Sequence, residues 1–283
     1  MRVATLNLWN KSGPWQRRMR LVGAEARALE VDVLCVQEVL ELERTTGSTP
    51  GTSSQLDEIE LPGFHRAFGL GHHMKGAWLP PGHALRFGNG VLSRWPITET
   101  HVEALPGADA SDQKRSLLHA VLAHPAGPLD VFVTHLNWKA DEGHLREAQV
   151  QHIATTVAER APADGRHAPI LCGDFNAEPG SDEIRYLRGL TRLGGERSVR
   201  FVDAWEFAGD APGHTFDPVR NEFARKYPRP GRRVDYVFVR GPLRAGRGVP
   251  LRAFLAFDRP GPDGVCASDH FGVCVDLHDG EEA

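Results

Sequence analysis

Short apolar segments alternate with helical segments along the chain. Val3–Leu8 has the pattern of a strand, Gln16–Leu29 places its apolar side chains at the spacing of one helix face, and Val31–Gln37 is a second strand. The other predicted strands are Gly90–Ser93, Leu117–Ala123, Leu129–His135, Pro169–Gly173, Val234–Val239, Leu251–Phe257 and Gly272–Leu277. The other predicted helices are residues 143–160 and Ser181–Leu190. This alternation predicts an α/β protein with mixed strands.

Two segments interrupt the alternation. Arg44–Gln55 has no periodic apolar positions and is predicted to be a surface loop, and Phe64–Gly90 is rich in glycine, histidine, proline and aromatic residues and is predicted to be irregular. Strand-like segments continue on both sides of each, and no internal repeat is present. We therefore expect one domain over residues 1–283.

Composition and charge narrow the possible functions. With 41% hydrophobic and 25% charged residues, the chain is not predicted to be disordered. Lys and Arg total 33 against 37 Asp and Glu, which excludes a bulk polycation but leaves nucleic acid open, because phosphate binding needs only a local basic face. The first residues lack the pattern of a signal peptide, and no apolar run has membrane-spanning length. The expectation is a cytoplasmic protein without a transmembrane segment.

Polar residues end or interrupt the predicted strands. They are Asn7, Glu38, His135, Asn137, Asp174, Asn176, Asp235, Asp269 and His270. An Asp or Asn after a strand is by itself most often a turn former, but several carboxylates close together are costly to bury unless a cation or mutual hydrogen bonding compensates them. Oxygen ligands of this type suit Mg²⁺, with Mn²⁺ as a substitute, and the set lacks the His and Cys cluster that zinc prefers.

Four short motifs, taken together and in order, resemble a known family. LN at the N-terminus, QE, GDFN and SDH span Asn7 to His270 and are similar to the endonuclease/exonuclease/phosphatase (DNase I-like) superfamily. The resemblance implies a four-layer α/β sandwich, in which two mixed β-sheets pack face to face with helices on both outer faces. It also implies a metal-dependent hydrolase that uses activated water to attack phosphorus in a phosphate ester.

The resemblance further implies roles for the metal and water residues. Glu38 is similar to the principal metal ligand, with Asn7 and Asp269 close to the ion or its water shell. Asp174 is similar to the residue that orients or deprotonates the attacking water, and Asn176 would hold that water and the scissile phosphate.

Two histidines have implied roles in binding phosphate. His270 is similar to the imidazole that contacts the phosphate, held in one tautomer by Asp235, a pairing that also has a physical rationale. His135 and Asn137 match the phosphate-binding His and Asn of DNase-like and sphingomyelinase-like members. Apurinic endonucleases have Tyr in place of this His, so the sequence argues against that subgroup.

Several other residues are candidates with a competing structural interpretation. Asn89 precedes a strand where the family often has a small or amide residue near the site, but Asn-Gly is also a simple turn. Arg115 could reach a phosphate, although a solvated arginine at a strand start is equally consistent. Trp9, Trp15 and Trp138 flank motif residues, and packing is favoured for them.

The segment 213–241 resembles the recognition loop that precedes the Arg-x-Asp motif in several subgroups. Five of its cations are Arg225, Lys226, Arg229, Arg232 and Arg233. They would place a local basic face near His270, which suits a phosphate-rich substrate.

The substrate class remains open between three phosphate esters. A nucleic-acid diester is favoured by the basic segment. A sphingomyelin-like lipid diester is suggested by the Thr-His-Leu-Asn motif and by the apolar loop Ala77–Gly82, although peripheral membrane contact is not favoured. A small phosphorylated metabolite is the third alternative. A binding module without activity is disfavoured because the expected catalytic residues are all present.

Overall fold

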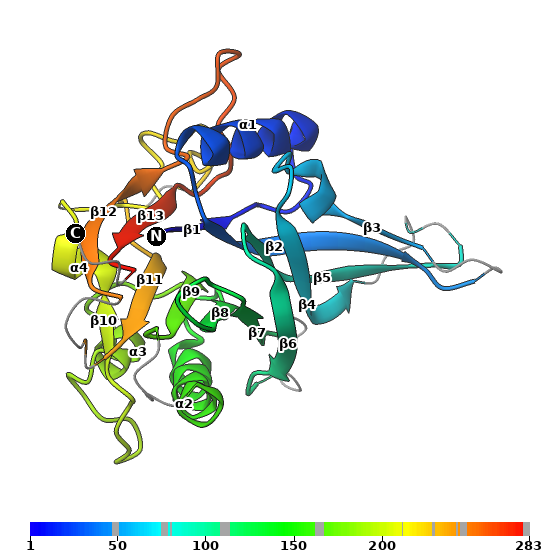
Figure 1. Cartoon of the computed structure of the whole chain (residues 1–283). Coiled ribbons are helices and arrows are strands. Elements are labelled where there is room, and N and C mark those ends of the chain that lie inside the picture. Colours follow the sequence, from blue (N-terminus) through cyan, green and yellow to red (C-terminus); the bar gives the residue numbers. More distant parts are fainter. Residues whose placement is uncertain are drawn as a thin grey trace.

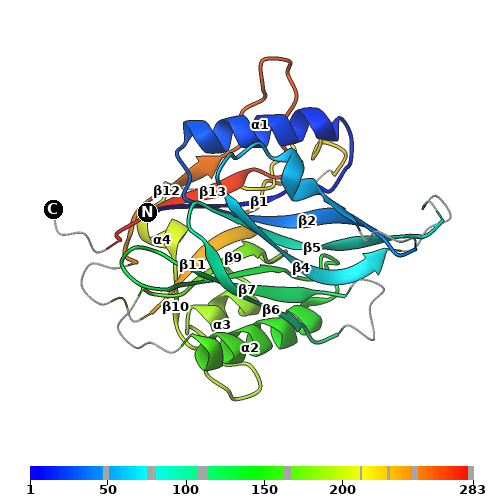
Figure 2. The ribbon, with the colours of Figure 1, turned by 45° about the vertical axis from the view of Figure 1, so that its right-hand side comes forward.

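The computed structural model describes residues 1–46, 51–74, 79, 81–107, 114–161, 167–210, 212–227, 230–241, 243 and 248–279. These residues form two β-sheets that pack against each other, with helices outside them (Figures 1 and 2). Nowhere in these ranges does a helix combine the length and the apolar character that crossing a membrane requires.

The first sheet holds the N-terminal and C-terminal strands side by side. Its strands run in the order β12-β13-β1-β2-β5-β4, and β3 pairs with β2 beyond that path. β1 and β2 are parallel, and the other pairs are antiparallel. The bounds are β1 (Arg2–Asn7), β2 (Val33–Arg44), β3 (Thr52–Ser54), β4 (His65–Met74), β5 (His83–Ser93), β12 (Pro250–Ala256) and β13 (Gly272–Leu277).

The second sheet has six strands in the order β10-β11-β9-β8-β7-β6. β8 and β9 are its parallel pair. The bounds are β6 (Ile97–Ala104), β7 (Ser116–Leu122), β8 (Leu129–His135), β9 (Ile170–Asp174), β10 (Phe201–Asp203) and β11 (Asp235–Arg240).

Helices cover the outer faces of both sheets (Figure 2). α1 (Trp15–Ala28) packs on the first sheet, and α2 (Gly143–Arg160) and α3 (Asp182–Leu187) pack on the second. A short 3-10 helix, η1 (Gln55–Glu58), lies beside β2, and α4 (Ala204–Ala208) contacts β11 and β12. The four-layer α/β sandwich expected from the sequence is confirmed.

The central strands are apolar on both faces because both faces are buried. Val131 and Val133 of β8 point into the core between the two sheets, whereas Phe132 between them packs under α2 and α3. On β2, Cys35 lies in the same inter-sheet core and Leu34 faces α1. Such strands read as continuous apolar runs in the sequence, which is why they were predictable.

Two predictions about irregular segments were wrong. The region predicted as irregular, Phe64–Gly90, contains β4 and most of β5, and Arg44–Gln55 begins at the end of β2 and includes β3. β4 lies at the edge of the sheet, so only part of it is buried, and its composition is polar and glycine-rich. Pairing with the neighbouring strand stabilises such a strand even though its own residues have only a weak preference for β structure.

Candidate active site

The predicted polar residues lie at one end of both sheets. Asn7, His135 and Asp174 are the last residues of β1, β8 and β9, Asp235 is the first residue of β11, and His270 comes just before β13. In the second sheet His135 and Asp235 are register partners of Asp174 on either side. The strand directions therefore bring residues far apart in the sequence into one group.

His270 joins two buried carboxylates. Its Nδ1 lies 2.9 Å from Asp235 Oδ2, and its Nε2 lies 3.8 Å from Asp174 Oδ2. Burial by itself lowers the pKa of His270, but the charges of Asp235, Asp174 and Asp269 outweigh it and raise this pKa well above its usual value. The imidazole is therefore a proton-bearing group held between acids.

Asp174 is the carboxylate at the centre of the group. Burial and the charge of Asp235 raise its pKa to about 7, against the opposing influence of His270 and of two hydrogen bonds. Those bonds come from Asn7 Nδ2 to Oδ2, 3.0 Å, and from the Asn176 amide to Oδ1, 2.9 Å. A carboxylate with such a pKa and fixed orientation can accept a proton near neutral pH.

The glycine of the GDFN motif is required at its position for a steric reason. Gly173 has φ 149°, and a Cβ there would lie 1.9 Å from the carbonyl oxygen of Thr134 on β8. Only glycine allows β9 to approach β8 this closely just before Asp174.

Glu38 is directed to the site by an irregularity in β2. The register with β5 shifts between Val36 and Val39, and Glu38 in the shifted stretch has φ 59°. Its carboxylate accepts from Asn7 Nδ2 at 3.4 Å and from Asn10 Nδ2 at 2.9 Å. A bulge beside a site commonly redirects one side chain in this way.

The donor set around Glu38 fits a hard divalent cation. Burial and the negative charge of Glu38 together raise the pKa of Asp269 to about 6, against the opposing positive charges of His270 and Arg18, so the two carboxylates repel one another. Glu38, Asp269 and Asn7 supply oxygen atoms, the ligands that Mg²⁺ prefers. A divalent ion would compensate the charge repulsion that the bare residues leave.

A second group of possible ligands lies beside this one. Asp174, Asp235 and His270 each offer a ligand atom within 4.8 Å of the others. His270 Nδ1 is held by Asp235, and its Nε2 lies 3.8 Å from Asp174 Oδ2. The same arrangement suits a hydrogen-bonded group that carries a proton or a metal site, since a bound metal displaces the proton of the imidazole.

Left-handed backbone at non-glycine positions concentrates around the site. The residues are Trp9 (φ 52°), Asn10 (φ 41°), Glu38 (φ 59°) and Asn176 (φ 49°). Such conformations persist only where the surrounding structure enforces them, and they are common at functional sites.

His135 differs from His270 in charge. Burial, together with the positive charge of Arg115 and the nearby His270, lowers the pKa of His135 well below its usual value. Its Nε2 lies 3.4 Å from Asp174 Oδ2. The neutral ring is suited to donate a hydrogen bond, and the two histidines of the site have opposite protonation preferences.

The predicted phosphate-binding residues have different surroundings. Arg115 is buried, and the carboxylates whose charges act on it are Glu38, Asp174 and Glu142, of which the first two belong to the site. Asn137 donates to Glu142 Oε2 at 2.8 Å and accepts from Gln149 Nε2 at 2.7 Å. It is held in place by the segment that leads into α2 and by α2 itself.

Asn89 joins the two sheets. From β5 of the first sheet, its Nδ2 donates to the carbonyl of Ser116 on β7 at 3.1 Å and to that of Val133 on β8 at 3.4 Å. These bonds give it a structural role, while substrate binding by Asn89 stays a prediction.

Part of the basic segment is directed away from the site. Arg233 is buried and forms an ion pair with Asp203, so it is not available to a substrate. Arg232 is partly buried, with its guanidinium 5.6 Å from the ring centre of Phe216, and Arg229 lies outside the described residues. Arg225 and Lys226 remain as exposed cations.

Three polar residues that support the site were not singled out from the sequence. Thr215 Oγ1 accepts from the Asp235 amide at 3.2 Å, and Asn221 Nδ2 donates to the Ser268 carbonyl at 2.8 Å, ahead of Asp269. Asn10 donates to Glu38. Thr215 lies in the segment 213–241, and only the folded chain shows these contacts.

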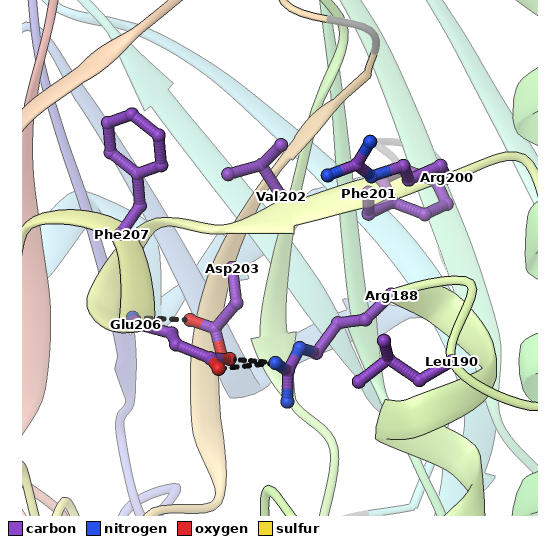
Figure 3. Close-up of a pocket in the computed structure, with 8 residues that line it drawn as sticks. All are labelled: Arg188, Leu190, Arg200, Phe201, Val202, Asp203, Glu206 and Phe207. Carbon is purple, nitrogen blue, oxygen red and sulfur yellow. Dashed lines mark hydrogen bonds and ion pairs between the residues drawn. The ribbon is translucent and has the colours of Figure 1, made fainter.

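A surface pocket of about 200 Å³ lies away from this site, beside β10 and α4 (Figure 3). Glu206 forms an ion pair with Arg188 across it, and Asp203 accepts from backbone amides at the start of α4. Two of its charged groups, Arg188 and Glu206, are engaged with one another, and its lining contains none of the predicted site residues.

The raised acid pKa values predict a pH-dependent stability without metal. The pKa of Asp174 is raised to about 7 and that of Asp269 to about 6, so each contributes stability that is full below about pH 4 and is lost as pH rises through these values. The contribution of His270 to stability changes with pH in the same direction, because its pKa is raised. That of His135 changes in the opposite direction, because its pKa is lowered. The melting temperature of EDTA-treated wild type should therefore fall relative to that of Asp174→Asn between pH 4 and 8.

We expect this relative fall to be about 2 °C or more by calorimetry. Mg²⁺ should stabilise the wild type more at pH 8 than at pH 5, since protons compete for the same carboxylates. A difference in melting temperature between the wild type and Asp174→Asn that stays constant at all pH values would contradict the raised pKa of Asp174.

Comparisons with known proteins agree on the relationship. The family model described as "Endonuclease/Exonuclease/phosphatase family" matches residues 4–270. "Protein angel homolog 2" of Bos taurus is 26% identical over 180 residues, which are 62% of this chain and 31% of that protein. This chain thus matches less than a third of the length of that curated relative.

Solved structures show the same fold. The structure of D. rerio TDP2 complexed with single strand DNA product has a TM-score of 0.72 and 19% identity, and the match covers 98% of each chain. An endonuclease/exonuclease/phosphatase from Beutenbergia cavernae has a TM-score of 0.70 and 24% identity, over 99% of this chain and 72% of the other. With the matched family model spanning the whole group of site residues, the chain belongs to the Endonuclease/Exonuclease/phosphatase family of hydrolytic nucleases and phosphoesterases.

Proposed function

We propose that the protein is a Mg²⁺-dependent phosphodiesterase that cleaves nucleic acid by attack of water on phosphorus. The observation that carries this proposal is the buried group of Asp174, His270 and Asp235 next to the carboxylates of Glu38 and Asp269. The group of Asp174, His270 and Asp235 would handle protons, and Glu38 and Asp269 would hold the cation that compensates negative charge. Phosphoryl transfer requires both.

Asp174 is the proposed acceptor of the proton from the attacking water. The Asn176 amide holds one of its oxygens, Asn7 Nδ2 holds the other, and the pKa of about 7 places proton uptake in the physiological range. Asn176 Nδ2 donates to the Leu136 carbonyl at 3.2 Å, which fixes its side chain beside the same position.

His270 and Arg115 are the proposed donors to the phosphate oxygens. Asp235 keeps the His270 ring protonated and oriented, and Arg115 brings a second buried positive charge to the site. Mg²⁺, when bound through Glu38, Asp269 and Asn7, supplies the remaining charge compensation. Mn²⁺ is the expected substitute.

An exposed basic and aromatic surface favours a nucleic-acid strand as the substrate. Lys226 Nζ lies 5.2 Å from the ring centre of Trp9 and 5.0 Å from that of Tyr227, and Tyr227 is 43% exposed. Phe216 connects Tyr227 to the site, because its ring contacts both Tyr227 and His270. A cation beside accessible aromatic rings can bind phosphate and stack bases.

The comparisons support the same substrate class. A structure of D. rerio TDP2, which shares the fold, is of a complex with single strand DNA product. For the lipid alternative, residues 77, 78 and 80 of the apolar loop lie outside the described residues, so no observation of the structure favours it.

The substrate proposal predicts the effect of removing one surface cation. Lys226→Ala should raise the KM for a labelled single-stranded oligonucleotide about 10-fold with little change in kcat, since Lys226 would bind the strand rather than the reacting groups. The measurement is steady-state cleavage with Mg²⁺, beside sphingomyelin vesicles and a phosphate monoester as alternative substrates.

Arg252→Ala is the matched control. Arg252 is also an exposed cation over an aromatic ring, 4.6 Å from the centre of Phe254, and it pairs in register with Asp276, near the end of β13 opposite to His270. It should cleave like the wild type. Cleavage of vesicles or monoester without cleavage of the oligonucleotide would reject the nucleic-acid assignment.

A further inference from the structure

The most deeply buried cation of the described chain is Arg18, in the first turn of α1. It is fully buried and is the largest of the fully buried side chains. Arginine is rarely buried to this extent unless its charge is paired. Every hydrogen bond of its guanidinium goes to a main-chain carbonyl oxygen, so no carboxylate is bonded to it.

These carbonyls belong to two separate segments. Most lie in the turn that follows β1, where the acceptors are Leu8 at 2.6 Å, Asn10 at 2.9 Å and Ser12 at 2.8 Å. One more belongs to Ala267, at 3.1 Å, 249 residues away in the sequence. The guanidinium therefore ties the turn after β1 to the segment before β13.

Each of the two segments presents a residue to the metal ligands. The turn carries Asn10, whose Nδ2 donates to Glu38 and whose Oδ1 accepts from Ser12 Oγ at 2.8 Å. The other segment continues through Ser268, whose Oγ donates to the Asn7 carbonyl at 2.6 Å, into Asp269. Asn10 and Trp9 have left-handed backbone, so the turn needs an external constraint to keep its shape.

We infer that Arg18 is a positioning residue for the metal site: it holds the turn that carries Asn10 and the segment that carries Asp269 in the relative arrangement that a divalent ion requires. This inference rests on the proposed metal dependence. Arg18 does not touch the substrate or the ion, and it acts through the backbone of these two segments. A planar guanidinium with five donors can satisfy more carbonyls at once, and in a fixed geometry, than a lysine ammonium with three donors.

The test compares Arg18→Lys with the wild type in Mn²⁺ binding by calorimetry and in oligonucleotide cleavage. Arg18→Lys keeps the buried charge but loses the planar guanidinium and its five donors. We therefore expect the Kd for Mn²⁺ to rise about 10- to 100-fold, as for residues that orient metal ligands. The KM for the oligonucleotide at saturating Mn²⁺ should change little. A lower melting temperature with unchanged Mn²⁺ affinity would show a merely structural role and overturn the inference.

Arg240→Lys is the matched control. Arg240, at the far end of β11, also donates to main-chain carbonyls, those of Val157 and Ala161 at the end of α2. Its replacement should leave the Kd for Mn²⁺ unchanged. Loss of Mn²⁺ affinity in this variant as well would mean that the loss of any arginine bonded to main-chain carbonyls affects the site through stability.

Asn10→Ala provides an independent variant if Arg18→Lys does not fold. It should also weaken Mn²⁺ binding, and the double variant should be less than additive because both changes act on the same turn. Unchanged Mn²⁺ affinity in Asn10→Ala would overturn the inference. If the wild type itself binds no divalent ion, the proposed function fails first, and the two failures remain distinct.

Discussion

Asp174→Asn is expected to reduce kcat for oligonucleotide cleavage by about 10³-fold or more. The asparagine has nearly the same shape and can still accept from the Asn176 amide, but it cannot take a proton from water. The acid it replaces is the most central of the buried group, with a pKa raised to about 7. The loss should appear in kcat, because Asp174 acts on the reacting water rather than on substrate affinity.

The fold of this variant should be intact. Removing a carboxylate that is costly to bury should keep or raise the melting temperature at pH 8. Asp130→Asn is a suitable control, because Asp130 contacts His119 near the start of β8, whereas His135 is the last residue of that strand. A rate for Asp174→Asn within a few-fold of the wild type would reject Asp174 as the proton acceptor.

Glu38→Gln is expected to weaken Mn²⁺ binding by at least about 100-fold and to abolish cleavage at ordinary Mg²⁺ concentrations. The glutamine can fill the same position in the bulge of β2, but it removes the negative charge that acts on Asp269. Partial recovery of cleavage at high Mn²⁺ would separate a loss of metal affinity from a loss of folding. Calorimetric titration with Mn²⁺ and cleavage at increasing Mn²⁺ measure the two effects.

Glu41→Gln is the matched control for this variant. Glu41 lies on the same strand, is also largely buried, and forms an ion pair with Arg86 at 3.1 Å. It should bind Mn²⁺ with wild-type affinity. Equal affinity in Glu38→Gln and the wild type would place the metal elsewhere, and the group of Asp174, Asp235 and His270 would then be the alternative site.

The sequence predicted the central strands and the long helices well. Strands such as β8 and β9 are buried on both faces, so their central residues form an apolar run, and α1 and α2 bury a regular stripe. The edge strand β4 and the polar ends of β2 and β5 were missed, because their stability comes from pairing with neighbours and not from their own residues.

The site, like the fold, could be predicted from the sequence only in part. Asn7, Asp174 and Asp235 were identifiable because each stands at the end of a strand, and the chemistry of their side chains is visible in the sequence. The protonation states of the site residues could not be identified from the sequence. His135 and His270 look alike in the sequence, yet burial beside Arg115 lowers the pKa of one, while neighbouring carboxylates raise that of the other.

The sequence by itself determined which residue types are available for phosphate chemistry and that apolar strands would bring them to one sheet end. Only the tertiary structure decided which cations are available to the site, because Arg233 forms an ion pair with Asp203, whereas the charges of Glu38 and Asp174 act on the buried Arg115. It also decided that Arg18, an ordinary helix residue in the sequence, joins two segments 249 residues apart. Charges and hydrogen bonds depend on distances in space, and these exist only once the chain is folded.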